Sequence, residues 1–137
     1  MHAVLADTGP IVAMLDRSDD GHEVCVRALK RLPATLFTVW PVVTEAMYLL
    51  GTVSWGAQRV LWDALDARHI VIIDLTEADM VRMRALMERY RDRPMDLADA
   101  ALVAVAEREG IRHIFTLDRT DFSIYRPAKL GRFTISP

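Results

Sequence analysis

Residues 3–15 read AVLADTGPIVAML, and this stretch combines the two kinds of element from which an α/β fold is built. The apolar run at 3–6 predicts a short buried strand that ends at Asp7. Pro10 suits the first turn of a helix, where its missing N–H is not needed, so a helix is predicted to continue through IVAML. Asp7 or Thr8 can cap that helix. The stretch therefore predicts a strand that passes directly into a helix.

The same alternation of strand and helix continues along the chain. Further strands are predicted at 35–40, 70–73, 111–117 and 132–135. Further helices are predicted over 21–32, 41–51, 57–68, a stretch with apolar residues at helical spacing from 80 to 90, and 97–109. Most strands are short apolar runs without strict polar alternation, which is typical of a parallel sheet covered on both faces. We therefore predict one α/β domain over residues 1–137, a three-layer sandwich with a mainly parallel central sheet.

Two of these helices have patterns that predict their packing. The helix LADAALVAVAE is apolar nearly all round until Glu107, so we expect it to be buried. Met80, Met83, Met87 and Tyr90 recur at helical spacing in the preceding helix. We interpret this methionine stripe as core packing, because methionine commonly fills irregular gaps in a core.

The bulk composition narrows the class of protein. The chain has 137 residues, 52% of them hydrophobic and 26% charged, an ordinary globular mixture. Its net charge of −2 means that nucleic acid would have to bind through a local basic patch. Cys25 is the only cysteine, which excludes an internal disulfide and fits a reducing compartment. There is no secretory leader and no run near the roughly 20 apolar residues of a membrane span, so we expect a cytoplasmic protein without a membrane partner.

Acidic residues follow the predicted strands. Asp7 follows the first strand directly, and Asp118 follows the strand that ends in IFTL. Glu45 lies one turn into the helix after the second strand, and Asp96 and Asp99 open the buried helix on one face. In an open parallel sheet, ligands bind beyond the carboxyl ends of the strands, at a topological switch point. We therefore expect acids from four segments to converge at one edge of the sheet.

A cluster of carboxylates favours a particular chemistry. Crowded carboxylates repel one another, and burial raises their pKa unless a positive charge compensates. The four histidines are scattered without zinc-binding spacing, and an all-oxygen cluster favours Mg²⁺ or Mn²⁺ over zinc. Such an ion is the usual partner of substrate phosphates and can activate a water for attack on phosphorus. The sequence therefore predicts metal-dependent phosphoester chemistry.

Several of these acids also have a structural interpretation. Asp7 can cap the first helix, a use compatible with metal binding. Glu45 lies early in a helix, where the dipole favours it, but its apolar neighbours predict a buried segment in which a charge needs a partner. The same burial argument applies to Asp99. Asp118 can be a turn residue, although its place after a buried strand favours a functional role.

Two acids stay open between a ligand and a helix cap. Asp96 is an almost ideal N-cap, with Asp99 at the third helical position. Asp121, in DRTDF, is more typical of a helix or turn cap.

Asp-Thr-Gly at 7–9 is also the tripeptide around which aspartic proteases build half of their catalytic dyad. Aspartic proteases of this size are all-β and dimeric, whereas this chain has helical periodicity where those folds need strands. The sequence context therefore disfavours a protease.

Four segments carry a resemblance to a known family: LADTGPIVAML, TEAMYLL, DLADAALVAVAEREGIRHIFTLDRTDF and the YRP that follows. In this order, and over nearly the whole chain, they resemble PIN-domain proteins of the VapC toxin type, from the toxin–antitoxin systems of bacteria and archaea. The resemblance implies a parallel-sheet sandwich whose acids hold Mg²⁺ or Mn²⁺ for endoribonuclease action. It also implies a structured RNA substrate such as tRNA or rRNA, products with 5′-phosphate and 3′-hydroxyl ends, a small antitoxin partner and a homodimer.

The resemblance assigns roles to individual residues. It matches the catalytic and metal-binding acids of the family to Asp7, Glu45, Asp99 and Asp118. Thr8 and Thr116 match positions where a hydroxyl supports the acids or a metal-bound water, and Asp96 joins the metal shell in a subset of members. Our hypothesis is that the aspartates ligate one or two ions while Glu45 orients or deprotonates the water. ALVAVA departs conservatively from the Ile-Ala-Ala that many members show.

Two groups of residues are candidates for binding RNA phosphates or a protein partner, and each also has a structural interpretation. An arginine group can position RNA phosphates, or form a solvated helix face with Glu88 and Asp92: Arg82, Arg84, Arg89, Arg91 and Arg93. Trp55, Trp62 and the methionine-rich helix can supply surface for the antitoxin or a second copy, or pack in the core.

Two other functions remain as alternatives. A Mg²⁺-dependent phosphatase of the haloacid dehalogenase type normally needs a second aspartate two residues after the nucleophile, where this chain has Gly9. A PIN fold that binds RNA or protein without cutting is the other alternative. The complete set of acids weighs against it.

Overall fold

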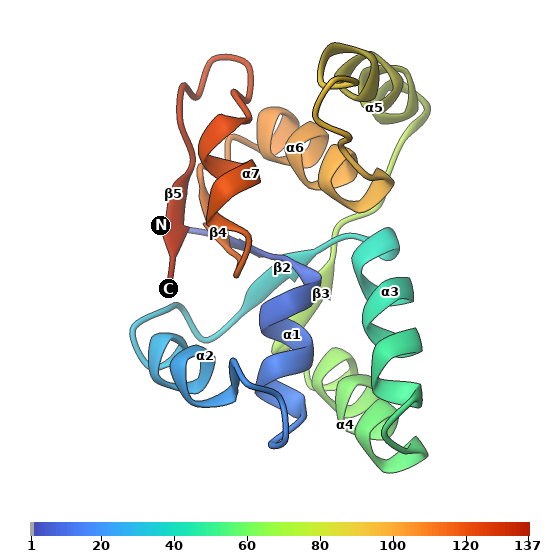
Figure 1. Cartoon of the computed structure of the whole chain (residues 1–137), viewed down its shortest axis with the longest axis vertical. Helices are drawn as coiled ribbons and strands as arrows, with labels where there is room; N and C mark the ends of the chain where they lie inside the picture. The colour runs from blue at the N-terminus through green and yellow to red at the C-terminus, as the bar shows by residue number, and fades with distance from the viewer. Residues whose placement is uncertain (1) are drawn as a thin grey trace.

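A five-stranded parallel sheet forms the centre of the computed structural model, which describes residues 2–137 (Figure 1). The strands are β1 (Val4–Ala6), β2 (Leu36–Thr38), β3 (Ile70–Ile72), β4 (His113–Phe115) and β5 (Thr134–Ser136). Their order across the sheet is β3-β2-β1-β4-β5, and every neighbouring pair is parallel. The predicted α/β sandwich is confirmed, and its sheet is parallel throughout the described residues.

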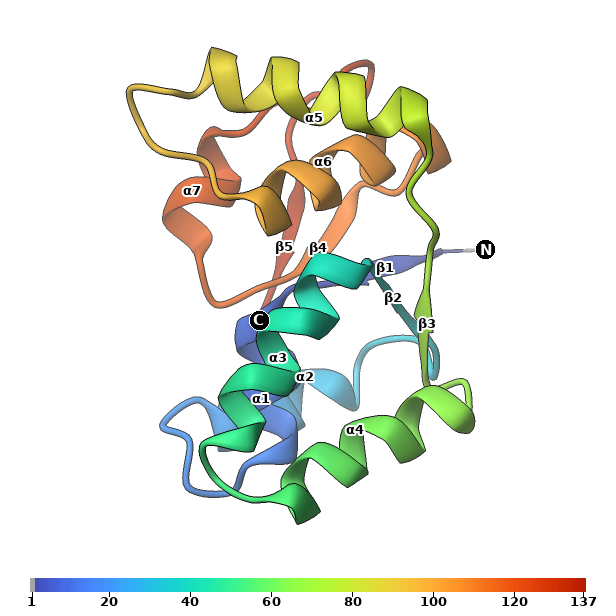
Figure 2. The ribbon, with the colours of Figure 1, turned by 90° about the vertical axis from the view of Figure 1, so that its right-hand side faces the viewer.

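Helices cover both faces of this sheet. They are α1 (Thr8–Leu15), α2 (His22–Leu29), α3 (Trp40–Gly51), α4 (Trp55–Asp66), α5 (Glu77–Arg89), α6 (Leu97–Glu109) and α7 (Arg119–Ile124). Figures 1 and 2 show α1 to α4 on one side of the sheet and α5 to α7 on the other. In Figure 2, α5 lies outside α6, so α6 is enclosed between α5 and the sheet. None of the helices between residues 2 and 137 combines the length and the apolar content that crossing a bilayer requires.

The order of the strands places a topological switch point between β1 and β4. The chain adds β2 and β3 on one side of β1 and then returns to add β4 and β5 on the other. Connections therefore leave the carboxyl ends of β1 and β4 in opposite directions and open a crevice there. Ala6 is in register with Phe115, and the Asp7 backbone N–H donates to the Phe115 carbonyl oxygen at 2.9 Å. The residues that follow these two strands thus lie side by side.

The predicted burial of α6 is confirmed. Every residue from Ala100 to Ala106 is buried. Alanines on several sides of this helix allow both α5 and the sheet to approach closely, so the helix has no solvated stripe in its middle. Its N-terminal end, which carries Asp96 and Asp99, is thereby held at a defined place beside the sheet.

The interpretation of the methionine stripe as core is wrong for two of its members. Met83 is buried, but Met80 is 65% exposed and Met87 is 36% exposed. The buried line of α5 runs through Asp79, Met83 and Leu86. Met80 and Met87 each lie one residue beyond this line and, with Leu97 at the start of α6, line a surface cavity. Because α5 packs chiefly on one helix, it buries only a narrow stripe.

The tryptophans of α4 also lie outside the core. Trp55 is 65% exposed and Trp62 is 44% exposed. Tyr48 on α3 is 73% exposed, and α3 packs against α4. Core packing is therefore excluded for these tryptophans, and large aromatic side chains are exposed on both helices of this pair.

The other predicted elements occur with ends shifted by a few residues. One helix, α7, was not predicted, because its six residues are too few to show a periodic pattern. Gly110 ends α6 in the left-handed conformation with φ of 68°, as expected for a C-terminal glycine.

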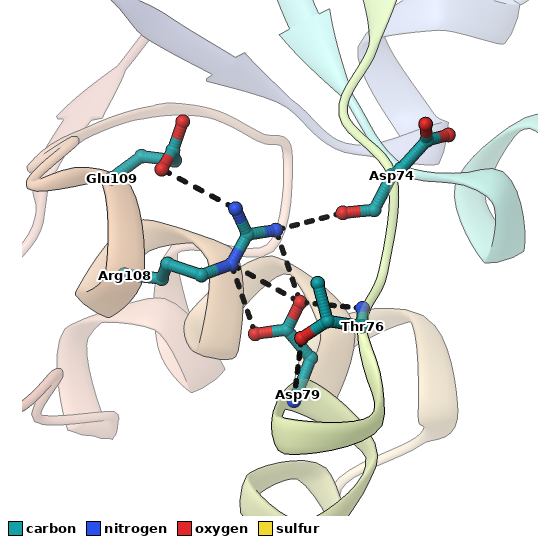
Figure 3. A network of polar contacts seen from close by, with 5 residues as sticks. All are labelled: Asp74, Thr76, Asp79, Arg108 and Glu109. Carbon is teal, nitrogen blue, oxygen red and sulfur yellow. Dashed lines mark hydrogen bonds and ion pairs between the residues drawn. The ribbon is translucent and has the colours of Figure 1, made fainter.

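An ion pair between the exposed Arg108 and the buried Asp79 ties α6 to α5 (Figure 3). The Arg108 Nε donates to both carboxylate oxygens of Asp79 at 3.1 Å, and its Nη2 donates to the Asp74 carbonyl oxygen at 2.7 Å. Asp79 also accepts from the Thr76 N–H, while Thr76 Oγ1 accepts from the Asp79 N–H, which makes a capping box. Burial acts to raise the pKa of Asp79, but the hydrogen bonds from Arg108 and Thr76 outweigh it and hold the pKa below its usual range.

We predict that Arg108→Met lowers the free energy of unfolding by about 1–2 kcal/mol, because it removes the hydrogen-bonded cation of Asp79, while the exposure of Arg108 to solvent weakens the pair. Urea denaturation at neutral pH measures this loss. Arg84→Met, on the exposed side of α5, is the matched control and should change stability by no more than about 0.5 kcal/mol. The stabilisation by Asp79 is present at neutral pH and is lost as acidification protonates it below its lowered pKa. Equal stability of the two variants would contradict the assignment.

Candidate active site

A cavity of about 480 Å³ opens beyond the carboxyl ends of β1 and β4, at the switch point. Six carboxylates line it: Asp7, Glu45, Asp96, Asp99, Asp118 and Asp121. No arginine, lysine or histidine of the described residues is among its lining side chains. The structure therefore brings the four acids predicted as catalytic into one cavity, together with Asp96 and Thr8.

Asp7 is held in place at the end of β1. It is the N-cap of α1, and its Oδ1 accepts from the Thr8 N–H at 2.8 Å. Its Oδ2 accepts from Thr116 Oγ1 at 2.8 Å, and that same hydroxyl oxygen accepts from the Asp118 N–H at 3.0 Å. The buried Thr116 thus joins the end of β1 to the segment after β4. Its predicted part in supporting the acids agrees with these contacts, but a role in catalysis stays a prediction.

The N-terminal end of α6 contributes the next two acids. Asp96 is the N-cap, as predicted, and its Oδ1 accepts from the Asp99 N–H at 2.8 Å. Asp99 is only 8% exposed, and its Oδ2 accepts from the Tyr125 hydroxyl at 2.8 Å. Capping and metal binding are compatible for Asp96, since its carboxylate also lines the cavity.

The start of α7 contributes Asp118 and Asp121. Asp118 is the N-cap of this helix, and its Oδ1 accepts from the Asp121 N–H at 3.0 Å. One carboxylate oxygen each from Asp99, Asp118 and Asp121 lies within 4.8 Å of the other two. Asp121 therefore belongs to the acid cluster geometrically, although the sequence favoured a cap.

Glu45 lies in the cavity wall but is exposed, so the expectation that it is buried is wrong. The buried side of α3 is formed by Val42, Val43, Ala46 and Leu50. Glu45 faces away from that side and towards the cavity. Its charge contributes to raising the pKa of Asp7.

The arginine group is less uniform than its sequence suggests. Arg82 forms a bidentate pair with Glu107, at 2.7 Å and 2.9 Å. Arg93 directly precedes Pro94 in the cavity wall, and its Nε lies 4.0 Å from Asp121 Oδ1. Of the five arginines, Arg93 is thus the one that the structure pairs with an acid of the site.

The two most buried acids of the cavity, Asp7 and Asp99, have no basic side chain paired with them in the described residues. Burial, aided by the charges of Asp96 and Glu45, raises the pKa of Asp7 to about 6 against its hydrogen bonds. Burial and the charge of Asp7 raise the pKa of Asp99 to about 8, although the Tyr125 hydrogen bond opposes this. A positive charge close to these two carboxyls would lower both pKa values.

A divalent cation fits this site on three grounds. All six side chains offer oxygen, the donor that Mg²⁺ and Mn²⁺ prefer. Burial and the charges of neighbouring acids raise the pKa values of Asp7 and Asp99, and a bound cation would favour the ionised form of both. Thr8 Oγ1 is buried without a hydrogen-bond partner in the described residues, and Thr8 lines the cavity. A buried hydroxyl of this kind needs a partner such as a water held by an ion.

We predict that the metal-free protein loses stability as the pH rises from about 4 to about 8. In this window the folded protein keeps protons on Asp99 and Asp7 that the unfolded chain has already released, so unfolding is favoured as the pH rises. Asp99→Asn removes most of this loss. At pH 8 the free energy of unfolding of the variant should exceed that of the wild type by at least about 1.4 kcal/mol, which corresponds to a shift of one pKa unit.

Urea titrations in EDTA at several pH values test this prediction. Asp63→Asn, an exposed acid on α4 outside the cavity, is the control and should follow the wild-type profile. A wild-type stability that rises across this window would contradict the raised pKa values.

Sequence reasoning did not find Tyr125, and it left Asp121 open between a ligand and a helix cap. Asp121 has a detectable signal, since it lies three residues after Asp118 just as Asp99 lies three after Asp96. Tyr125 lies in the YRP segment, but a tyrosine in the sequence does not predict a contact with an acid 26 residues earlier. That contact exists only because α7 packs beside α6.

The sequence of this chain matches a known protein family and a ribonuclease. Residues 4–128 match the family described as PIN domain. The chain is 30% identical over 135 residues to Ribonuclease VapC26 of Mycobacterium tuberculosis (strain ATCC 25618 / H37Rv), which covers 98% of this chain and 100% of that protein.

Solved structures of similar fold include three described as follows. The toxin VapC20 of Mycobacterium tuberculosis, described as cleaving the sarcin-ricin loop, has a TM-score of 0.72 at 19% identity, over 82% of this chain and 87% of that one. VapBC2 from Rickettsia felis, bound to a promoter DNA fragment, gives 0.69 at 15% identity, over 98% and 99%. FitAcB from Neisseria gonorrhoeae gives 0.61 at 20% identity, over 96% of each chain. At these identities the likeness concerns the fold.

Proposed function

Because the chain belongs to the PIN-domain family, we propose that it is an endoribonuclease that hydrolyses RNA phosphodiester bonds with the help of Mg²⁺ or Mn²⁺. The observation that carries this proposal is the cavity at the switch point, where six carboxylates converge and, within the described residues, Asp121 alone among them has a paired basic side chain, Arg93. Similarity to a ribonuclease along nearly the full length of both chains supports the reaction class. The protein is proposed to be the toxin of a VapBC-type pair.

Each acid has a proposed role in this reaction. Asp7, Asp99 and Asp118 hold the cation, with Asp96 and Asp121 as further oxygen donors. When bound, Mg²⁺ or Mn²⁺ supplies positive charge to the scissile phosphate and makes a water more acidic. Glu45, exposed at the cavity wall, accepts the proton of the attacking water.

The surroundings of the acids orient them for this work. Thr116 fixes Asp7 through Oδ2, and its hydroxyl also anchors the backbone that leads to Asp118. The Thr8 hydroxyl is available to hold a water within the cavity, because no protein group in the described residues occupies it. Arg93, beside the cavity, is proposed to contact an RNA phosphate and to release Asp121 as it does so.

The proposed partners follow from the same family membership. We propose a structured RNA, tRNA or rRNA, as the substrate, so that the protein acts in the cytoplasm. A cognate antitoxin and a second copy of the chain are the proposed protein partners. The exposed aromatic side chains Tyr48, Trp55 and Trp62 support the presence of a binding surface on α3 and α4.

Purified protein should cleave cellular RNA in the presence of Mg²⁺ or Mn²⁺ and lose this activity in EDTA. Asp7→Asn should lower the cleavage rate by at least about a hundredfold, since it weakens a direct metal donor that Thr116 and Thr8 position. Cleavage is followed on gels with the products mapped to the nucleotide. Asp63→Asn, outside the cavity, should retain wild-type activity.

Two results would overturn the proposal in different ways. Cleavage that is indifferent to both EDTA and Asp7→Asn would remove the metal-dependent mechanism. RNA binding without any chelator-sensitive cleavage would instead favour a PIN fold that only binds.

The ends of the products give an independent check. Attack by water with the 3′ oxygen as leaving group produces a 5′-phosphate and a 3′-hydroxyl, whereas attack by the RNA 2′-hydroxyl produces a cyclic phosphate and a 5′-hydroxyl. We expect products that accept a 5′ label from a kinase only after phosphatase treatment. Products that are labelled directly would exclude the 3′ oxygen as the leaving group and would contradict the proposed reaction.

A further inference from the structure

The hydroxyl of Tyr125 reaches the acid cluster from inside the protein. Tyr125 is fully buried, and its OH donates to Asp99 Oδ2 at 2.8 Å. Asp99 Oδ1 accepts no hydrogen bond from residues 2–137 and is not among the fully enclosed atoms. One oxygen of this carboxylate is therefore committed to the protein, and the other is available to the cavity that Asp99 lines.

This hydrogen bond joins two elements that carry the site. Tyr125 is the C-cap of α7, and its backbone N–H donates to the Asp121 carbonyl oxygen at 3.0 Å. Asp118 and Asp121 lie in the first turn of that same helix, whereas Asp99 lies in the first turn of α6. A single hydroxyl thus links the helix that carries two of the clustered acids to the third acid of the cluster.

The ring of Tyr125 has little freedom to move its hydroxyl elsewhere. It packs edge-on against Tyr90, with ring centroids 5.1 Å apart, and against Phe122, with centroids 5.2 Å apart. It is the ring of Tyr90 that confines Tyr125: the Tyr90 hydroxyl accepts from the Arg126 N–H at 3.0 Å and has no hydrogen bond to Tyr125 or to an acid of the described part of the chain. The donor is therefore held at a set position before any cation arrives.

A donor at this position has a specific use. Carboxylates that repel one another tend to rotate apart, and a ligand that must be reoriented binds a cation less tightly. Groups that hydrogen-bond to a metal-binding carboxylate fix its orientation, and their loss typically weakens metal binding 10- to 100-fold. No other side chain of the described residues donates to Asp99.

We propose that Tyr125 is a positioning residue of the metal centre, which holds Asp99 so that its free oxygen faces the cation and keeps α7 in register with α6. This inference rests on the proposed metal-dependent function. Both effects act through one hydrogen bond, from the Tyr125 hydroxyl to Asp99.

The test is Mn²⁺ binding to the whole chain without RNA, measured by the electron paramagnetic resonance signal of free Mn²⁺. Tyr125→Phe, which removes only the hydroxyl, should weaken Mn²⁺ affinity by about tenfold. Tyr90→Phe is the matched control: it removes the hydroxyl of a partly buried tyrosine from the same aromatic cluster, but one that contacts the Arg126 backbone and no acid among residues 2–137. Its Mn²⁺ affinity should equal that of the wild type.

RNA cleavage separates positioning from a general structural effect. At saturating Mn²⁺ the cleavage rate of Tyr125→Phe should return towards the wild-type rate, with the loss confined to the Mn²⁺ concentration needed for half-maximal activity. A variant that only damaged the fold would not be rescued in this way.

A second measurement needs no change at Tyr125. In the Tyr90→Phe variant the remaining tyrosines are the buried Tyr125 and the exposed Tyr48. Raman bands that report hydrogen bonding of the phenol should shift when Mn²⁺ is added, because a cation on Asp99 weakens its carboxylate as an acceptor. An unchanged spectrum, or equal Mn²⁺ affinity of Tyr125→Phe and wild type, would overturn the inference alone. A wild type with no Mn²⁺ affinity would remove the proposed function and the inference with it.

Discussion

The parallel pairing of β1 with β4 is the contact on which the rest of the site depends. It aligns Ala6 with Phe115, so that Asp7 and Thr116 emerge at the same level from neighbouring strands. The Thr116 hydroxyl then bonds both Asp7 and the backbone before α7. A slip of one residue in this register would turn each of these side chains to the opposite face of the sheet. The convergence of acids thus begins with main-chain hydrogen bonds rather than with the acids themselves.

Two buried acids, Asp79 and Asp99, have contrasting neighbours and pKa values that are shifted in opposite directions. Asp79 has a cation of its own: Arg108 binds both of its oxygens, and its pKa lies below the usual range (Figure 3). Asp99, which is also buried, has a hydroxyl and several like charges as neighbours, and its pKa is raised to about 8. Asp79 is thus paired with a cation of the protein itself, whereas the carboxylate of Asp99 is available to bind an external ion. This contrast distinguishes a structural ion pair from a candidate metal site better than the number of acids does.

Helix α7, the shortest helix of the described residues, positions three side chains of the site. Its first turn presents Asp118 and Asp121, and Tyr125 at its end contacts Asp99. Because six residues bury little surface of their own, α7 depends on Phe122 and on the aromatic cluster around Tyr125 for its place. The packing of these rings is therefore part of the arrangement of the acids. Stability and function are coupled here through ordinary core contacts.

Local patterns in the sequence were enough to determine the alternation of strands and helices, the parallel sheet and the burial of α6. They also determined that Asp7, Asp99 and Asp118 would follow strands or open helices at one edge, because strand ends and helix caps are set by neighbouring residues. Tertiary structure alone decided that Glu45 is exposed, that Met80 and Met87 lie outside the core, and that Asp121 and Tyr125 join the acids. The physical reason is that burial and contact depend on which face of a helix meets which neighbour. Periodicity gives the spacing of a stripe, but the packing partner selects the direction in which that stripe points.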